Sequence, residues 1–233
     1  MPERGELLRP DRRRHRRRCA LRRRHPCPRR RRGTGGRPRR PRLRGGRRGR
    51  EGRPVVRLRE ATPDDADAVA AVAADAWWAA CSAALSAEAV RTALADLYDE
   101  AFLGEVAAEA ADQPDFRFLV AVETEAGGES PGDGETVVGF ASAAREWADE
   151  VELFTLYVDP DRWGEGVGSE LLAALEAWAA DRGAERMVCS ALADNAVAVG
   201  FLESRGFERT REVEAAVGGE TTAEYEFEKS LDG

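Results

Sequence analysis

The sequence predicts an α/β fold for residues 54–233, a layered domain in which about four helices flank a mixed central sheet of about six to seven strands. Apolar patterns with the period of a strand alternate along the chain with patterns of helical period. A glycine-rich turn leads directly from a strand pattern into a helix, and the strand after that helix should return parallel through a right-handed crossover. About 180 residues suit one domain with its own core.

Each element follows from its period and its flanking residues. Thr62 should cap the first helix, because proline at the first helical position and an acidic residue at the third position follow it. Val69, Val72 and Trp77 of that helix should point inward. In chain order we expect a strand at 55–59, a helix from 62 to about 80, a helical stretch from the Ser86 cap to about 111, strands at 116–123 and 136–144 joined by a polar hairpin loop at 125–135, and a strand at 151–158.

The elements after the glycine turn show the same signals. The helix that follows the turn carries apolar residues at three-to-four spacing, and it should end at Gly183. Its inward residues are Leu171, Leu172, Leu175 and Trp178. The remaining predicted elements are a strand at 186–191, a helix from an Asp194/Asn195 cap to Gly206, and strands at 208–217 and 222–229.

The glycine turn itself predicts an anion site. Gly164, Gly166 and Gly168 stand at alternate positions, and the following helix turns its unpaired N–H groups and its positive dipole end toward the same point. A dinucleotide-binding turn needs its third glycine one residue after Gly168, and this chain has Ser169 at that position. A P-loop needs a lysine at the helix start, and Lys229 is the only lysine in the chain. The turn therefore indicates some other phosphorylated ligand, with a purely structural turn as the alternative.

Two stretches together resemble the GNAT superfamily of acyl-CoA-dependent N-acyltransferases. Residues 160–168 look like the acyl-CoA loop of that family, and the resemblance covers about residues 55–231. The helix at 195–207 follows the family's spacing of asparagine, alanine, phenylalanine, glutamate, glycine and phenylalanine. The matching residues are Asn195, Ala198, Phe201, Glu203, Gly206 and Phe207.

The resemblance implies acetyl-CoA as co-substrate and no metal. It implies that the backbone at 156–158 pairs with the pantetheine arm, that the Val158 amide polarises the thioester oxygen, and that amides at 163–169 hold the pyrophosphate. Alternatively, Asn195 is only a helix cap and Phe201 only a core residue. The cofactor-binding residues implied in this way are Leu156, Tyr157, Val158, Arg162, Trp163, Gly164, Glu165, Gly166, Val167, Gly168, Ser169, Asn195 and Phe201.

The chemistry that the resemblance implies needs a base, because a lysine-type amine titrates near 10.4 in water and must be neutral to attack a thioester. Glu152 is the candidate, since it begins the strand that enters the turn, at the position where the histone-acetylating branch of the family carries its general base. The alternative is a surface glutamate at a strand edge. Glu150 and Glu146 are lesser candidates.

Two positions depart from the family pattern. Trp163 replaces the usual glutamine or arginine, although Arg162 beside it could supply a charge to the phosphates. Leu202 replaces the tyrosine that usually protonates the departing thiolate. Tyr157, Tyr98 or a water molecule could take that role, and the sequence does not choose among them.

The charge of the chain is divided between two unlike parts. Residues 1–53 hold 24 of the 36 basic and 4 of the 43 acidic residues, a net charge of +20, whereas the remaining residues carry a net charge of −27. The first part is rich in arginine, proline and glycine, so we expect it to be disordered. It could be a nucleic-acid-binding arm, a metal site made by His15, Cys19, His25 and Cys27, or the product of a mis-assigned start before a GTG codon at residue 55 or 56.

Composition also bounds location and partners. No signal peptide and no apolar run of about 18 residues is present, so we expect a soluble, cytoplasmic protein without membrane contact. Cys81 and Cys189 lie in apolar patterns and should be buried free thiols. An acidic domain with a single lysine suits molar salt, which predicts a halophilic source, and the alternative is that the acidity attracts a polyamine or a basic peptide.

Three functions follow from these observations. The first is an N-acetyltransferase that moves an acetyl group to a primary amine of a small molecule or peptide. The second, motivated by Leu202, is a catalytically weak acyl-CoA-binding regulatory module. The third is a nucleic-acid- or ribosome-associated protein that acts through a real basic tail. A homodimer is one assembly that the sequence leaves open, and the acceptor is not identified.

Overall fold

The structure, a computed structural model, describes residues 55–124, 134–145 and 147–231. The expected disordered tail at 1–53, the histidines and cysteines of that tail, most of the predicted loop at 125–135 and Glu146 lie outside the described residues.

The described residues form one seven-stranded sheet and five α-helices, which confirms the predicted α/β fold with a mixed sheet. The strand order is β1-β2-β3-β4-β5-β7-β6, and the pairing of β4 with β5 is parallel, whereas the other pairings are antiparallel. The elements are β1 (Val55–Glu60), a 3-10 turn η1 (Pro63–Asp65), α2 (Ala66–Cys81), α3 (Ala87–Leu97), α4 (Glu100–Ala110), β2 (Phe116–Thr124), β3 (Glu135–Arg145), β4 (Glu150–Val158), a 3-10 turn η2 (Pro160–Arg162), α5 (Val167–Asp181), β5 (Arg186–Leu192), α6 (Ala196–Ser204), β6 (Glu208–Val217) and β7 (Glu220–Ser230).

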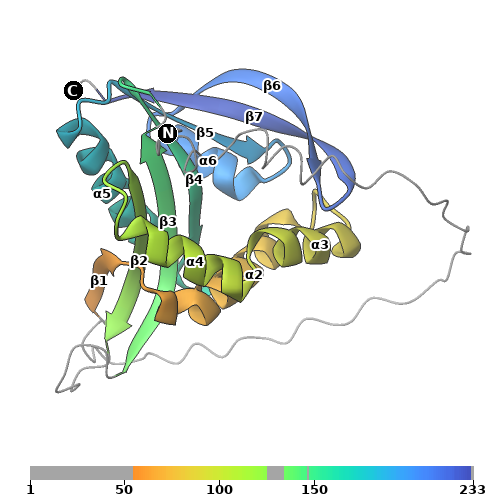
Figure 1. The fold of residues 1–233 in the computed structure, drawn as a ribbon. Helices are drawn as coiled ribbons and strands as arrows, with labels where there is room; N and C mark the ends of the chain where they lie inside the picture. Colours follow the sequence, from red (N-terminus) through yellow and green to blue (C-terminus); the bar gives the residue numbers. More distant parts are fainter. Residues whose placement is uncertain (1–54, 125–133, 146, 232–233) are drawn as a thin grey trace, which may run out of the picture. The chain divides into compact units, whose positions relative to one another are not determined.

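Two apolar cores lie on opposite faces of the sheet, as the alternation along β2 shows. Leu119 and Ala121 belong to the core under α5, whereas Phe118 and Val120 belong to the core under α2, α3 and α4. Figure 1 shows α2 and α4 together across one side of the strands, with α5 apart from them. The residues predicted to point inward are all buried: Val69, Val72, Trp77, Leu171, Leu172, Leu175 and Trp178.

The predicted single helical stretch from 86 to about 111 is wrong, because the chain forms two helices there. Tyr98 leaves the helical conformation at φ −128° and ψ 35°, and the Asp99 carboxylate accepts a hydrogen bond of 3.1 Å from the Phe102 amide. An aspartate that bonds the amide three residues on begins a new helix instead of continuing the old one. The buried Tyr98 ring packs edge-on against Trp77, with ring centroids 6.1 Å apart, and this contact holds the bend in place.

The predicted Thr62 cap precedes the 3-10 turn η1, and the α-helix α2 begins three residues later than η1, with Asp65 as its N-cap. The Asp65 carboxylate accepts hydrogen bonds from the Thr62 amide at 2.8 Å and the Thr62 hydroxyl at 2.9 Å, and Arg59 donates two further bonds of 2.7 Å. Burial alone would raise the pKa of Asp65, but the hydrogen bonds from Arg59 and Thr62 outweigh it and lower that pKa. The first turn is therefore fixed by a charged cap.

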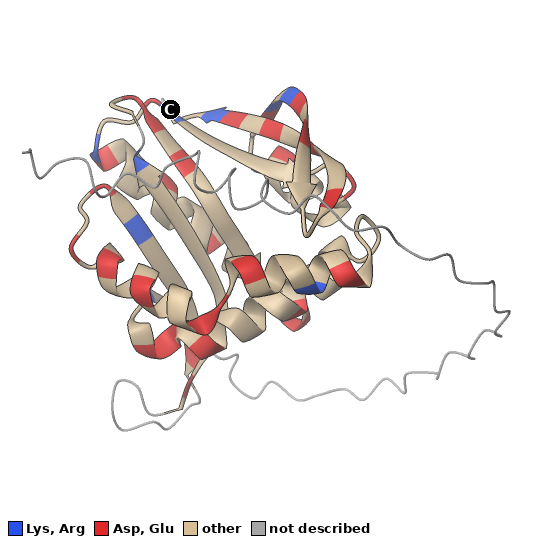
Figure 2. Ribbon diagram, turned by 45° about the vertical axis from the view of Figure 1, so that its right-hand side comes forward, with Lys and Arg blue, Asp and Glu red and all other residues tan. Residues whose placement is uncertain are grey.

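Asp and Glu outnumber Lys and Arg in residues 54–233, and Figure 2 shows them distributed over the helices and the connecting turns. No helix in the described ranges is long and apolar enough to cross a membrane.

Candidate active site

The parallel strands β4 and β5 separate soon after they meet. They pair at Glu150, Val151 and Glu152 of β4, and the described structure gives no further pair between them. β4 continues to Val158 along β3, so after Glu152 its other edge has no strand partner in the described residues. This unpaired stretch between β4 and β5 is called the opening below. Glu152 sits at the last paired position, where the opening begins.

A bulge in β4 sets which side chains face each side of the sheet. Ser142 of β3 pairs with Thr155 and Ala143 pairs with Leu153, so Phe154 is the extra residue. After the bulge, Leu156 packs against the core under α5. Tyr157 packs against the other core, which α2, α3 and α4 cover.

The glycine turn lies between the end of β4 and the start of α5. Gly164 and Gly166 have φ values of 81° and 101°, a left-handed conformation that glycine adopts without strain, and a Cβ at either position would meet no atom within 4 Å. At Gly168 a Cβ would lie 3.5 Å from both Leu156 and Phe201. The turn thus brings the open edge of β4, the first turn of α5 and one face of α6 together.

The first amides of α5 have no side-chain cap. The N-cap residue is Gly166, and within the described part of the chain the amides of Gly164, Gly166, Val167 and Gly168 donate to no other residue. By contrast, Ser86, Asp99 and Asn195 cap α3, α4 and α6 with side-chain oxygens. Four backbone donors at the positive end of a helix, beside space that no side chain fills, fit the phosphate groups of an acyl-CoA.

Three other amides of the predicted anion site already donate hydrogen bonds to backbone carbonyls. The amides of Trp163, Glu165 and Ser169 donate to the carbonyls of Pro160, Arg162 and Gly166. Within the predicted set from Trp163 to Ser169, the amides of Gly164, Gly166, Val167 and Gly168 are thus the ones without a bonded acceptor in the described residues.

Arg162 and Trp163 hold the turn in place. The Arg162 guanidinium donates two hydrogen bonds, 2.6 and 2.8 Å long, to the buried carboxylate of Glu123 on β2. The hydrogen bonds that Arg162 donates to Glu123 also hold the pKa of Arg162 above its ordinary value. Trp163 donates its indole N–H to the Val158 carbonyl at 2.8 Å. In this structure both side chains tie the turn to the sheet, and the Arg162 charge is compensated by a carboxylate.

The predicted residues of α6 occupy defined places. The Asn195 oxygen accepts a 3.0 Å hydrogen bond from the Ala198 amide, and its amide nitrogen donates to Cys81 Sγ at 3.7 Å. Asn195 is thus a buried cap that links α6 to α2. Phe201 is half-buried beside Gly168. Leu202 is 6% exposed in the core under α5, where it has no proton to donate.

Burial shifts the pKa of Tyr157 and of the two cysteines in the described residues. Burial raises the pKa of Tyr157, whose ring centroid lies 5.7 Å from that of Tyr98, so the phenol stays protonated at neutral pH. Burial, followed by the charge of Glu152, raises the pKa of Cys189 to about 12. Burial also raises the pKa of Cys81 to about 11, and both cysteines are free, buried thiols as predicted. Neither cysteine is suited to act as a nucleophile.

Two residues that no sequence motif marks also border the site. Glu123 follows the apolar run 118–122 of β2, and a buried acid directly after such a run is the only signal for its ion pair. Arg205 ends α6 and lines a cavity of about 530 Å³ next to Ser169. In the described ranges, no group of three potential metal ligands gathers in space.

Comparisons with known proteins agree with this geometry. Residues 77–207 match the model of the Acetyltransferase (GNAT) family. No curated protein gives a match. The fold is similar to that of PaiA N-acetyltransferase from Thermoplasma acidophilum, solved in complex with coenzyme A, with 20% identity and a TM-score of 0.63 over 76% of this chain and 99% of that one.

Two further solved structures are similar. A GCN5-related N-acetyltransferase from Rhodopseudomonas palustris shares 27% identity, with a TM-score of 0.58 over 77% of this chain and 96% of that one. The acetyltransferase yncA from Salmonella typhimurium, solved with its cofactor acetyl-CoA, shares 23% identity, with a TM-score of 0.55 over 77% and 95% of the two chains. The family model spans more than half of this sequence. The chain belongs to the acetyltransferase (GNAT) family and is an acyltransferase.

Proposed function

We propose that this protein transfers an acetyl group from acetyl-CoA to a primary amine of a small molecule or a peptide. The uncapped N-terminus of α5 carries the proposal, because its free amides lie beside the open edge of β4. The similar structures from Thermoplasma acidophilum and Salmonella typhimurium contain coenzyme A and acetyl-CoA respectively, which supports the choice of acyl donor.

The proposed binding mode uses backbone groups. The amides of Gly164, Gly166, Val167 and Gly168 hold the pyrophosphate, while the edge of β4 from Leu156 to Val158 receives the pantetheine arm. Phe201 packs near the cofactor beside Gly168. The Val158 amide is proposed to polarise the thioester oxygen. Trp163 holds Val158 in position, because its indole N–H donates a hydrogen bond to the Val158 carbonyl.

Glu152 is proposed as the general base. It stands where β4 and β5 part, so an amine that enters the opening meets a carboxylate close to the strand edge that receives the thioester. The carboxylate takes a proton from the ammonium form of the acceptor, directly or through water, and the neutral amine then attacks the carbonyl carbon. Glu150, the lesser candidate, is less suited because Arg186 donates to its carboxylate at 3.1 Å.

The buried Leu202 leaves the departing thiolate without a proton donor at that position. A thiol of pKa about 8.5 leaves as a thiolate without strict need of a general acid, so turnover survives the substitution at a reduced rate. Tyr157 is the proposed donor, because it stands on the stretch of β4 proposed to receive the pantetheine arm and its phenol is protonated at neutral pH.

The test is Glu152→Gln, with release of free thiol from acetyl-CoA measured across a panel of amines. We expect kcat to fall by about 10²- to 10⁴-fold, and the affinity for acetyl-CoA to stay the same, because a general base acts in the chemical step alone. The loss should shrink at high pH, where the acceptor amine is already neutral.

The control is Glu109→Gln, which removes the same charge from the exposed face of α4. Equal activity of the wild type and Glu152→Gln at neutral pH would rule out this role for Glu152. Tight binding of acetyl-CoA with no turnover on any amine would favour a regulatory binding module instead.

We also propose a halophilic cytoplasm as the setting of this enzyme. The support is the net charge of −27 on residues 54–233, with one lysine among them. Molar salt reduces the Debye length to about 3 Å and screens the repulsion among surface carboxylates. The midpoint of thermal unfolding should therefore rise steadily from dilute buffer to molar KCl, and an unchanged midpoint would contradict the proposal.

A further inference from the structure

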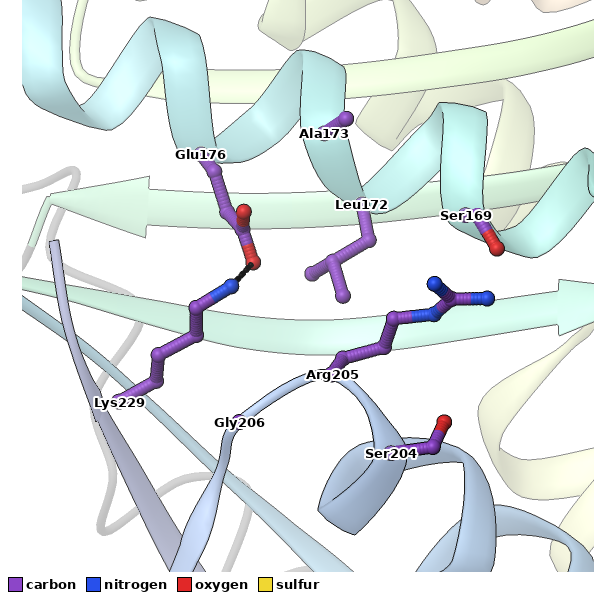
Figure 3. A pocket seen from close by; sticks show the side chains of 8 residues that line it. All are labelled: Ser169, Leu172, Ala173, Glu176, Ser204, Arg205, Gly206 and Lys229. Carbon is purple, nitrogen blue, oxygen red and sulfur yellow. Dashed lines mark hydrogen bonds and ion pairs between the residues drawn. The ribbon is translucent and has the colours of Figure 1, made fainter. Parts of the chain in front are cut away.

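The pocket beside the first turn of α5 contains an arginine that is not paired with any carboxylate of the described residues. The pocket lies between one face of α5 and the turn from α6 into β6, and Figure 3 shows the Arg205 guanidinium reaching toward Ser169. On the far side of the pocket, Lys229 is paired with Glu176 at 2.6 Å. Those two charges cancel, so the pocket has a net positive charge from Arg205.

Such an arginine is unusual in this domain, where acids outnumber bases by 39 to 12. Nine of the 12 basic side chains form ion pairs with described carboxylates: Arg57, Arg59, Arg117, Arg145, Arg162, Arg186, Arg209, Arg211 and Lys229. Arg91, Arg182 and Arg205 have no carboxylate partner within the described ranges. Of these three, Arg205 lines the pocket.

The surroundings of Arg205 leave its donors available. Its guanidinium carbon lies 5.4 Å from the Phe201 ring centroid, within reach of a cation–π contact. Within the described residues its side chain forms no ion pair, and its planar guanidinium has the N–H groups for a two-pronged hydrogen bond with a phosphate. Phe201 also contacts the Gly168 position, which connects Arg205 to the proposed cofactor site.

We propose that Arg205 binds the 3′-phosphate of the coenzyme A ribose and makes the enzyme selective for the 3′-phosphorylated cofactor. This inference rests on the proposed function. Coenzyme A carries one diphosphate and one phosphate monoester, and the free amides of α5 already provide for the diphosphate. The monoester bears a charge of about −1.5 to −2 at neutral pH, and a guanidinium that no carboxylate neutralises is the matching group.

The experiment measures the affinity of the full chain for coenzyme A and for 3′-dephospho-coenzyme A by calorimetry. We expect the wild type to prefer coenzyme A by about tenfold, the usual size of one partly exposed charge-assisted contact. Arg205→Gln should bring the two affinities together by weakening coenzyme A alone. Arg205→Lys, which keeps the charge, should restore part of the preference.

Arg91→Gln is the matched control, because it removes an exposed, unpaired arginine from α3, away from the residues that line the pocket. The arginines of residues 1–53 are present in every variant and cancel in the comparison. Equal weakening of both ligands by Arg205→Gln, or no weakening of either, would overturn the assignment. If the wild type binds neither ligand, the proposed function itself fails, and the result is thus distinct from a failure of the 3′-phosphate site.

Discussion

The helices α5 and α6 meet where Gly168 approaches Phe201, yet their first amides are satisfied in different ways. α6 begins at the buried Asn195, whose side chain bonds the Ala198 amide. α5 begins at Gly166, which has no side chain to offer. A helix start that lacks an internal acceptor leaves its donors for a ligand, whereas a capped start contributes to stability. The two helices show how one fold assigns the same backbone groups to binding in one place and to structure in another.

A second contrast concerns the two arginines that flank these helices. Arg162, just before the glycine turn, is fully engaged by the buried Glu123. Arg205, just after α6, rests on an aromatic ring and has no carboxylate partner in the described part of the chain. Proximity to the anion site in sequence therefore does not identify the arginine that is available to a phosphate.

The largest expected effect comes from giving α5 the kind of start that α4 has. Gly166→Asp places a carboxylate beside the free amides, where it repels the pyrophosphate and competes for its donors. We expect the affinity for acetyl-CoA to fall by well over about tenfold, as measured by calorimetry. Gly219→Asp is the control, because Gly219 also has a positive φ, of 86°, and open space around its Cβ position, but lies in the turn between β6 and β7. Unchanged affinity in a folded Gly166→Asp protein would mean that the phosphates bind elsewhere.

The next effect concerns the charged cap of the first helix. Asp65→Asn removes a carboxylate that accepts bonds from Arg59 and Thr62. We expect a loss of about 2 kcal/mol in the free energy of unfolding at neutral pH, without any change in cofactor affinity. Denaturant unfolding and calorimetry on the same samples separate the two quantities.

The same cap has a defined dependence on pH. Because the folded-state pKa of Asp65 is lowered, its contribution to stability is complete above the unfolded pKa of about 3.9 and is lost as the pH falls through the folded pKa. The difference in stability between the wild type and Asp65→Asn should therefore close in acid. A difference that stays constant down to low pH would show that the charge of Asp65 is not what stabilises the turn.

A smaller loss is expected at the neutral cap of α6. Asn195→Ala leaves the Ala198 amide without its acceptor and Cys81 without its donor. Replacement of a helix cap by alanine lowers the free energy of unfolding by about 1 kcal/mol. Urea denaturation measures this loss. If Asn195 also contacts the pantetheine arm, the affinity for acetyl-CoA should fall by more than the loss of stability explains. That outcome would mean that the start of α6 serves binding as well as structure.

The smallest effect extends the contrast to the pocket. Glu176→Gln removes the carboxylate that neutralises Lys229, so the pocket gains a positive charge. We expect the affinity for coenzyme A to rise by about threefold, since partly exposed charge pairs contribute little. Calorimetry with coenzyme A and its 3′-dephospho form checks this, and a decrease in affinity would argue that the ion pair shapes the pocket rather than weakening its charge.

Local signals in the sequence were enough for most of the fold. The Thr62 and Asn195 caps, the glycine turn and the apolar spacing of α5 each act over a few residues, so they predict helix starts and buried faces directly. Local signals do not predict the break at Tyr98, because the helical pattern runs through it and the competing Asp99 cap is a single residue. Arg162 and Glu123 lie 39 positions apart in the sequence, so no local pattern predicts their hydrogen bonds.

The sequence by itself determined the α/β fold, the family resemblance and the glycine turn ahead of α5, because hydrophobic period, caps and glycine spacing depend on neighbouring residues. Only the tertiary structure decided which donors are free. It separates β4 from β5 after Glu152, commits Arg162 to Glu123 and leaves Arg205 on the face of Phe201. The physical reason is that availability for a ligand depends on every group packed within hydrogen-bonding distance, and those groups come from strands and helices far apart in the chain.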